Sequence, residues 1–491
     1  MASLEAHFNR FREQIIGYDH SFETPYGRKR LVYADWTASG RLYRPIEEKL
    51  LNELGPFVGN THSESSVTGT TMTQAYHRAH DVIKRHVNAG PHDALLFVGF
   101  GMTAAVNKFQ RILGLRVPEQ LQPYLKLPDE LRPIVFVTHM EHHSNHTTWY
   151  ESIADVVVLK PTADGQVDLD DLKELLHEHR HRQLKIGSFT ACSNVTGVET
   201  PYGELAKIMH ENGGLCFVDF AASAPYVKID MHPPDPLQKL DAIFFSPHKF
   251  LGGPGTPGVL IFDSRLYHIE HPDQPGGGTV LWTNPWGKYR FKPEIEERED
   301  GGTPGFLQAI KAAMTIELKQ EMGIEKLRER ENQLVRKFFS GLRKIPGLTI
   351  LADNLDHRIG MFSFYFNDIH YNLVVKLLND RFGIQSRGGC SCAGTYGHYL
   401  LHLDQFTSKR ITDKIDEGDQ SVRPGWVRLS IHPTTTDEEA DFIIDAVAQI
   451  GRHGKEWGED YAYDVHTNEF RHKRENGQVA LTVDRWFSLA E

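Results

Sequence analysis

Short apolar runs alternate with stretches of helical periodicity through the central part of the chain, from about residue 94 to residue 262. This alternation is typical of α/β proteins, in which helices cover both faces of a mostly parallel sheet. Ligands of such sheets gather beyond the carboxyl ends of the strands. The apolar runs occupy residues 94–98, 134–138, 156–159, 185–191, 215–219, 242–245 and 258–262, and helical periodicity occupies residues 103–113, 169–179 and 202–211.

The N-terminal part of the chain is expected to begin with a short amphipathic helix. A strand is then predicted for residues 31–35, and Pro45 is well placed to open a helix that runs to about residue 54. A polar loop at residues 60–71 precedes another helix at residues 73–88. The apolar stripe of the first helix consists of Leu4, Phe8, Phe11 and Ile15.

A second pattern of strands and helices begins after a loop-rich segment at residues 272–305. A second alternation of strands and helices after a long loop-rich segment predicts a second, smaller domain. We expect a large domain at residues 30–295, a small domain at residues 1–29 plus 300–450, and a C-terminal extension at residues 451–491 without an assigned role. In the second part, helices are predicted for residues 306–345 (interrupted near Gly323), 371–382 and 437–450, and strands for residues 361–366, 384–387 and 427–431.

Composition narrows the class of protein. The 491 residues are 40% hydrophobic and 24% charged, which is enough apolar material for a large core. The formal charge of −11 argues against a nucleic acid or an anionic membrane as the main partner. We expect no membrane span, because no run of about 18 apolar residues occurs.

The N-terminus carries charges where a signal peptide needs an apolar segment. Only four cysteines occur, too few for a disulfide framework in so long a chain. We therefore expect a cytoplasmic protein with reduced thiols. The 27 histidines form no HExxH motif and the chain has no paired CxxC spacing, so no metal site is predicted.

A lysine follows one of the most apolar predicted strands. Residues 242–245 are Ala-Ile-Phe-Phe, and Ser246, Pro247, His248 and Lys249 come directly after them. A buried charge is costly, and a desolvated lysine loses its proton and becomes a nucleophile. A Schiff base to pyridoxal phosphate (PLP) is one explanation, and a lysine whose stem reaches solvent is the alternative.

Other predicted strands also end in polar groups. The turn at residues 97–103 leads into a helix, and the backbone N–H groups of Gly101 and Met102 with the Thr103 hydroxyl are suited to cradle a phosphate. An ordinary tight turn would look the same. His142, which follows the next strand, is suited to stacking on a flat cofactor or to acid–base work, although plain loop polarity is an alternative.

Two further strand ends carry an amide and a carboxylate. Asn194 can hydrogen-bond a phenolic oxygen, or it can be a simple turn residue. Asp219 ends an apolar strand and is suited to hold the pyridinium proton of PLP, or to cap the helix that follows. In one parallel sheet all of these groups would meet at the same edge, where they supply every contact that PLP needs.

The motifs around these residues resemble those of the class V aminotransferases, which are fold-type I PLP enzymes, near the cysteine desulfurases and selenocysteine lyases. The resemblance spans about residues 30–450 and implies an aspartate-aminotransferase-like fold. It is most specific at MEHHSN (140–145), SNVTG (193–197), VDFAAS (218–223), SPHKFLGG (246–253), GGGT (276–279), GGTPG (301–305), RGGCSCAG (387–394) and VRLSIHPT (427–434).

The resemblance implies a role for each matching residue. Lys249 matches the lysine that forms the Schiff base, Asp219 the pyridinium partner and His142 the residue stacked on the ring. Asn194 matches the contact to the cofactor phenolate or the substrate. Phosphate contacts are implied for Thr103, Ser246 and His248.

The remaining matches concern the partner subunit and the substrate. Thr279 resembles the threonine that family members offer to the phosphate of a neighbouring subunit, which implies a homodimer. Arg428 matches the clamp for the α-carboxylate of an amino-acid substrate, a task that suits a bidentate guanidinium. His62 lies where the family has a histidine near the substrate, and Arg387 is suited to bind substrate or to brace its loop.

Two departures from the desulfurase pattern affect the expected reaction. Ala222 replaces a glutamine near the phenolic oxygen, and the cysteine loop contains two thiols, Cys390 and Cys392, of which register favours Cys392. If the substrate is L-cysteine, Cys392 takes its sulfur as a persulfide, leaves alanine and passes the sulfur to an acceptor protein. Transamination, epimerisation or C–S lyase chemistry without a protein cysteine, inert loop thiols, and a catalytically inactive binding protein are the alternatives.

Overall fold

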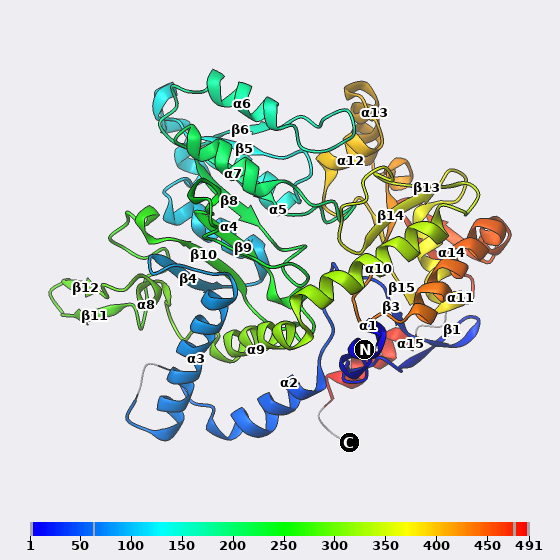
Figure 1. Cartoon of the computed structure of the whole chain (residues 1–491), viewed down its shortest axis with the longest axis horizontal. Coiled ribbons are helices and arrows are strands. Elements are labelled where there is room, and N and C mark those ends of the chain that lie inside the picture. Colours follow the sequence, from blue (N-terminus) through cyan, green and yellow to red (C-terminus); the bar gives the residue numbers. More distant parts are fainter. Residues whose placement is uncertain (1–2, 62–63, 475–477, 489–491) are drawn as a thin grey trace.

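A seven-stranded sheet forms the centre of the larger part of the computed structural model, which describes residues 3–61, 64–474 and 478–488 (Figure 1). Its inner strands are buried almost throughout, as expected for a sheet covered on both faces, whereas the edge strand β6 is half-buried. In spatial order they are β4 (Asp93–Val98), β10 (Gly258–Asp263), β9 (Ala242–Phe245), β8 (Leu215–Asp219), β7 (Lys185–Thr190), β5 (Ile134–Val137) and β6 (Asp155–Val158).

The predicted mostly parallel sheet is confirmed, with one reversed strand. Strand β10 runs antiparallel to both of its neighbours, β4 and β9, whereas the contacts from β9 to β6 are parallel. Strand β4 therefore points in the same direction as β9. The carboxyl ends of β4, β5, β7, β8 and β9, where the polar residues were predicted to gather, all lie at one edge of the sheet.

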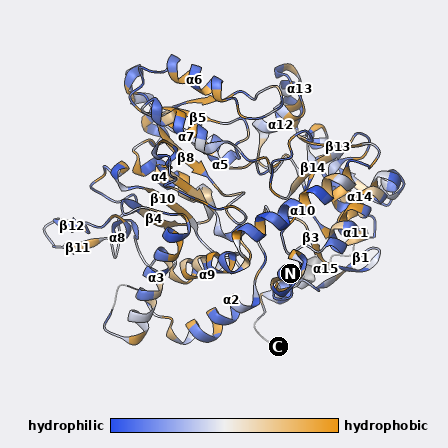
Figure 2. Cartoon of the chain, in the orientation of Figure 1, coloured by the Kyte–Doolittle hydropathy of each residue, from blue (hydrophilic) through white to orange (hydrophobic). Residues whose placement is uncertain are grey.

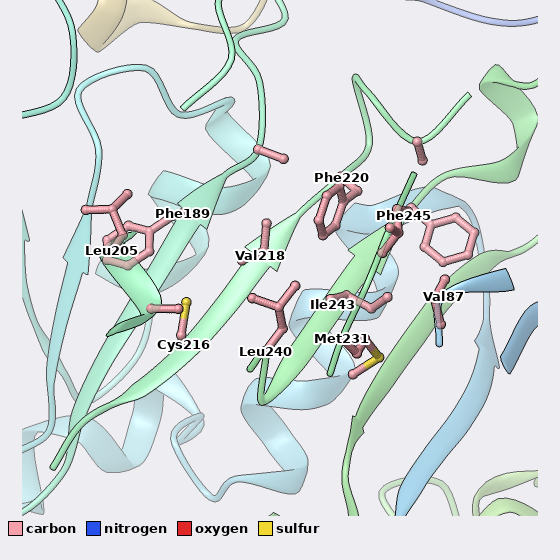
Figure 3. Close-up of a cluster of buried hydrophobic side chains, with 14 of the residues drawn as sticks. Val87, Phe189, Leu205, Cys216, Val218, Phe220, Met231, Leu240, Ile243 and Phe245 are labelled. Atoms are coloured by element: carbon pink, nitrogen blue, oxygen red, sulfur yellow. The ribbon is translucent and has the colours of Figure 1, made fainter. Parts of the chain in front are cut away.

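Successive side chains of each strand pack into different layers. Phe217 and Phe244 pack with the apolar faces of α4 (Gly101–Ile112) and α5 (His143–Tyr150). Val218 and Ile243 point to the opposite face, into the cluster drawn in Figure 3. That cluster is completed by α3 (Val67–His86), α6 (Leu169–Glu178), α7 (Tyr202–Glu211) and α9 (Phe306–Met322).

A four-stranded antiparallel sheet forms a second core (Figure 1). Phe338 stacks on Phe362 in this core, with ring centroids 4.8 Å apart. The sheet has the order β13 (Leu348–Ile350), β14 (Met361–Phe366), β17 (Trp426–Ser430) and β16 (Arg387–Gly389). It is packed by α10 (Ile324–Leu342), α11 (Tyr371–Phe382) and α14 (Asp437–Gly458).

A segment near the N-terminus links the two cores. Strand β3 (Val32–Tyr33) pairs in parallel with β15 (Ile384–Gln385), and Asp35 forms a bridge to Ser430 of β17. The chain then continues along the large sheet, where Gly40 N donates to the carbonyl oxygen of His248. Residues 32–40 therefore contact both sheets at the place where they meet.

The amphipathic N-terminal helix and the interrupted long helix are confirmed as α1 (Leu4–Arg12) and as α9 followed by α10. The helix opened near Pro45 consists of α2 (Arg44–Glu48) and a π-helical continuation, Lys49–Leu54. Helix α3 begins at Val67, earlier than predicted, because the Ser66 side chain accepts from Gly69 N and caps it. Figure 2 shows the hydrophobic colours concentrated on the strands of the large sheet.

Several short elements were missed because they carry little apolar periodicity. They are the hairpins β1 (Ser21–Thr24) with β2 (Gly27–Arg30) and β11 (Val280–Thr283) with β12 (Tyr289–Phe291), and helices α8 (Ile295–Glu299), α12 (Gly394–Leu400) and α13 (Gln405–Asp416). The unassigned C-terminal residues form the end of α14, then β18 (Tyr461–Asp464), β19 (Glu469–His472) and α15 (Gln478–Trp486). The hairpin β18–β19 packs on α11, where Tyr461 Oη donates to Asp380. The domain boundaries drawn from the sequence stay a prediction.

In the part of the chain that the structure describes, no helix is long and apolar enough to cross a membrane.

Two glycines allow backbone segments to approach the loop that carries Lys249. A Cβ atom on Gly40 would lie 1.8 Å from the carbonyl oxygen of Phe250, and one on Gly253 would lie 1.9 Å from that of Pro247. Real Cβ atoms do not make such contacts, so any side chain at either position must displace the loop. The position of Lys249 therefore depends on the absence of side chains at both glycines.

Gly253→Ala is expected to lower the free energy of unfolding by about 1–3 kcal/mol, because the added methyl group overlaps backbone atoms that have little room to move. Urea denaturation of the apoprotein measures the change. Gly277→Ala is the matched control, since a Cβ atom there meets no other atom within 4 Å. Equal stability of the two variants would contradict the close-packing argument.

Candidate active site

A cavity of about 490 Å³ lies where the carboxyl edge of the large sheet meets the second sheet. Most of the residues singled out in the sequence line it: Gly101, Met102, Thr103, His142, Asn194, Asp219, Ser246, His248, Lys249, Arg387, Cys392 and Arg428. Thr279 does not line this cavity and lies at the base of the hairpin β11–β12. His62 lies outside the described residues.

The turn between β4 and α4 presents the first backbone N–H groups of a helix to the cavity. Gly101 adopts a positive φ of 66°, a conformation that glycine reaches without strain. Met102 N donates to the Ser246 hydroxyl over 2.8 Å, and the hydroxyls of Thr103 and Ser144 are 2.6 Å apart. Because helix N-termini attract anions, this cluster is well suited to hold a phosphate.

Lys249 ends a short 3₁₀ turn, Pro247–Lys249, directly after β9. Burial lowers the pKa of its amine to about 8, and the nearby Asp219 carboxylate acts in the opposite direction. A fraction of this amine is therefore neutral near physiological pH, as a nucleophile or proton carrier requires.

Asp219 ends β8 beside that amine. Burial raises the pKa of its carboxyl to about 6, while the hydrogen bond from Ala221 N (2.8 Å) and the charge of Lys249 oppose the shift. The carboxylate is thus ionised above pH 6 and can hold a proton on a basic ring nitrogen. Ala222 lines the cavity close by and offers no side-chain donor there.

His142 is held by its own helix terminus. Its Nδ1 accepts from Ser144 N over 3.1 Å, so it caps α5. Burial, together with the charge of Lys249, lowers the pKa of His142 to about 3. A neutral imidazole of this kind is suited to stack on an aromatic ring and is a poor acid at neutral pH.

Sequence reasoning overlooked Glu141, which ties the start of α5 to the ends of β5 and β7. Its buried carboxyl accepts from Thr138 Oγ1 (2.8 Å), Thr190 N (2.8 Å) and Asn145 Nδ2 (2.8 Å). Burial raises the pKa of Glu141 to about 8. The signal for this residue was a carboxylate four residues after the end of the apolar strand β5.

Two polar atoms of residues that line the cavity have no hydrogen-bond partner in the described part of the chain. Asn194 Oδ1 and Arg428 Nε are buried, and neither has a hydrogen-bond partner within the described residues. Asn194 Nδ2 instead donates to Ser391 O over 2.6 Å. An unpaired buried acceptor and an unpaired buried donor are costly unless a ligand satisfies them. Asn194 and Arg428, together with the turn Gly101–Thr103, Asp219 and Lys249, fit the polar groups of PLP and of an amino acid.

The cysteine loop presents its two thiols to different surroundings. Cys392 is exposed and lines the cavity, whereas Cys390 is half-buried and packs against the core of the large sheet. Ser391 and Cys392 both adopt left-handed backbone conformations, with φ of 52° and 55°. His143 fixes this loop, because its N–H donates to Cys392 O (2.8 Å) and its ring accepts from Gly394 N (2.9 Å).

Two arginines enter the cavity from the second sheet. Arg387 of β16 lies directly opposite Arg428 of β17, so the two side chains share one face. Asp35, which sequence reasoning missed, pairs with both. The only hint in the sequence was an acidic residue at the end of a predicted strand.

The sequence profile of the Aminotransferase class-V family matches residues 32–443. The chain belongs to this family. Its members depend on PLP, so the protein is a PLP-dependent enzyme, and the cofactor and fold class inferred from the motifs are confirmed. The roles assigned to single residues stay predictions, although the cavity brings nearly all of them together.

Curated relatives carry a more specific name. A probable cysteine desulfurase of Halalkalibacterium halodurans is 29% identical over 375 residues, which cover 74% of this chain and 84% of the relative. One from Staphylococcus epidermidis is 29% identical over 378 residues, 76% of this chain and 85% of the relative. Among solved structures, the apo cysteine desulfurase of Thermococcus onnurineus superposes with a TM-score of 0.72 at 22% identity, over 90% of this chain and 98% of that one. The last similarity supports the fold.

The charge of Asp219 should affect the pKa of Lys249, which can be followed through the pH dependence of PLP uptake. The rate at which apoprotein takes up PLP is expected to rise with pH through about 8, because only the neutral amine reacts. Asp219 stabilises the ammonium form, so Asp219→Asn should move the midpoint to lower pH. Stopped-flow absorbance of PLP uptake measures the midpoint.

Asp235→Asn is the control for this titration, since Asp235 pairs with Lys207 away from the cavity and should leave the midpoint unchanged. A midpoint that stays in place in Asp219→Asn, or moves to higher pH, would contradict the interaction between the carboxylate and the amine.

Proposed function

We propose that the protein is a cysteine desulfurase that removes sulfur from L-cysteine and holds it on Cys392 as a persulfide. The observation that carries the proposal is an exposed thiol, Cys392, on the wall of the cavity that also contains Lys249 and Arg428. The names of the curated relatives, probable cysteine desulfurases at 28–29% identity, point in the same direction.

Bound PLP supplies an electron sink for the α- and β-carbons of an amino acid. The turn Gly101–Thr103 with Ser246 and His248 would hold the phosphate, Asp219 would keep the ring nitrogen protonated, and His142 would cover one face of the ring. Asn194 is placed to hydrogen-bond the cofactor phenolate or the substrate. The Lys249 amine carries the substrate α-proton, since its pKa of about 8 lets it exist in both forms near neutral pH.

The sulfur transfer requires a nucleophile from the protein. The Cys392 thiolate is the group of this chain that can form a bond to the substrate sulfur as the carbon–sulfur bond of the substrate breaks. Bound PLP would supply the electron sink for the electron pair of that broken bond. One proton returned to the β-carbon and one returned to the α-carbon by the Lys249 amine give alanine. The persulfide on Cys392 is then consumed by an external thiol, for which an acceptor protein is a candidate.

Cys392→Ser should abolish sulfide and alanine formation from L-cysteine while PLP stays bound, because serine keeps the shape of the side chain but lacks the thiolate. Sulfide and alanine assays in the presence of an added thiol measure the loss, and the PLP absorbance reports cofactor binding. Cys390→Ser is the matched control and should retain most of the activity, because Cys390 packs against the core.

Unchanged turnover in Cys392→Ser would overturn the proposal. It would leave transamination, epimerisation or C–S lyase chemistry at the same cavity, which need no protein cysteine. Amino-acid panels that follow α-keto acids, loss of optical activity and pyruvate distinguish these three reactions.

We also propose that the enzyme acts as a homodimer with the hairpin β11–β12 at the interface. Thr279, at the base of this hairpin, is fully buried and its hydroxyl donates to Gly276 O over 2.7 Å, so it can contact a phosphate in the partner's cavity only if this turn opens. The hairpin β11–β12 projects from the body of the protein (Figure 1) and exposes Leu281, Trp282, Trp286 and Tyr289. Phe100 is 90% exposed beside the phosphate turn. Apolar surface of this extent is typical of an interface rather than of a free monomer surface.

Light scattering is expected to give the mass of a dimer. The paired change Leu281→Asp and Trp286→Asp should shift the protein to monomers, because it buries two charges in the contact. Phe406→Asp, at an equally exposed aromatic residue on α13, should leave the dimer intact. A monomeric wild-type protein would contradict this assembly.

A further inference from the structure

Asp35 joins the two arginines that enter the cavity. Its Oδ1 accepts from Arg428 Nη2 over 2.8 Å, and its Oδ2 accepts from Arg387 Nε over 3.2 Å. The Asp35 side chain is 14% exposed, while those of Arg428 and Arg387 are 3% and 50% exposed. Each carboxylate oxygen thus serves a different guanidinium, one of them buried and the other open to solvent.

The backbone around Asp35 is fixed independently of these ion pairs. Ser430 N donates to Ala34 O over 2.7 Å, and Thr37 N donates to the Ser430 hydroxyl over 2.9 Å. Strand β3 is tied to β15 in the same region. Main-chain hydrogen bonds on both sides of residue 35 therefore hold the carboxylate next to the arginines, and a bound substrate would have to break them to displace it.

The charges of Asp35, Arg387 and Arg428 add to a small positive net charge. Two guanidinium groups and one carboxylate leave a net charge of +1. Asp219 is the one acidic residue among the described residues that line the cavity, and its charge acts on Lys249. Arg428 Nη1 is already bonded to Asn194 O, so its buried Nε is the donor left without a partner among the described atoms.

We propose that Asp35 is a positioning residue that orients Arg387 and Arg428 and limits their joint charge to +1, so that the site selects amino acids with one carboxylate and an uncharged side chain. This inference rests on the proposed action on an amino acid, and it names the substrate class. It does not depend on which thiol accepts sulfur. An amino acid with a second anionic group would bring two negative charges to a clamp that balances one.

Removing the charge of Asp35 should change which amino acids the site prefers, and not only weaken the binding of all of them. Asp35→Asn raises the joint charge to +2, which favours dianionic amino acids such as L-aspartate or L-cysteine sulfinate over L-alanine. We expect the ratio of Kd for L-alanine to Kd for L-aspartate to rise about tenfold, since a unit charge within several ångströms in a partly buried site acts strongly. Binding is measured on the holoenzyme from the change in PLP absorbance.

A charge-compensating pair of variants separates this role from a general loss of structure. Arg387→Gln lowers the joint charge to zero and should shift the ratio in the opposite direction, with weaker binding of both amino acids. The double variant Asp35→Asn with Arg387→Gln restores +1, and its ratio should return close to that of the wild type. Purely structural damage would instead accumulate in the double variant and leave the ratio unchanged.

Glu439 provides a matched control. It also bridges two arginines, Arg12 at 2.8 Å and Arg30 at 3.5 Å, and its side chain is 9% exposed, but it lies outside the cavity. Glu439→Gln should therefore leave the alanine-to-aspartate ratio unchanged. If Asp35→Asn does not fold, the comparison of Arg387→Gln with the wild type still tests the predicted direction of the shift in the ratio.

The possible outcomes separate this inference from the proposed desulfurase activity. A ratio that is the same in wild type, Asp35→Asn and Arg387→Gln overturns the role of Asp35, while sulfide release by the wild type stands. A wild type whose PLP absorbance responds to no amino acid overturns both. The inference is supported if the ratio is highest in Asp35→Asn, lowest in Arg387→Gln, and similar in the wild type and the double variant. This holds even if turnover is unchanged in Cys392→Ser.

Discussion

A half-buried lysine beside a buried carboxylate is the interaction on which the active site depends. Removing Lys249 and Asp219 from water separately is costly, and their proximity at the ends of β9 and β8 reduces the cost for both. The environment lowers the pKa of the amine to about 8 and raises that of the acid to about 6. A proton carrier and a fixed anion are thus produced by the same environment.

The parallel direction of the strands brings the other groups to this pair. Because β4, β5, β7, β8 and β9 point the same way, the phosphate turn, His142, Asn194 and Asp219 all reach one edge. The reversed strand β10 does not disturb this, since it fills the place between β4 and β9 without contributing a carboxyl end there. Close approach at Gly40 and Gly253 then fixes the lysine loop.

The arginine side of the cavity has a different origin. Its two arginines come from neighbouring strands of the second sheet, and the acid between them, Asp35, follows β3. The arginines and the pair Lys249–Asp219 therefore rest on separate cores that meet at residues 32–40. The same separation applies to the cysteine loop, in which one thiol faces the core and the other the cavity.

The amino-acid sequence alone determined the features that depend on local pattern. Apolar runs located the strands of the large sheet, and the polar residues after them predicted the cofactor and most of its contacts. Local pattern could not reveal which distant segments meet: Asp35 with Arg387 and Arg428, the reversal of β10, or the exposed hairpin β11–β12. These depend on register and on packing between residues far apart in the chain, so only the tertiary structure decided them. It also distinguished Cys392 from Cys390, because two residues in one loop differ in burial only once the loop has packed against both sheets.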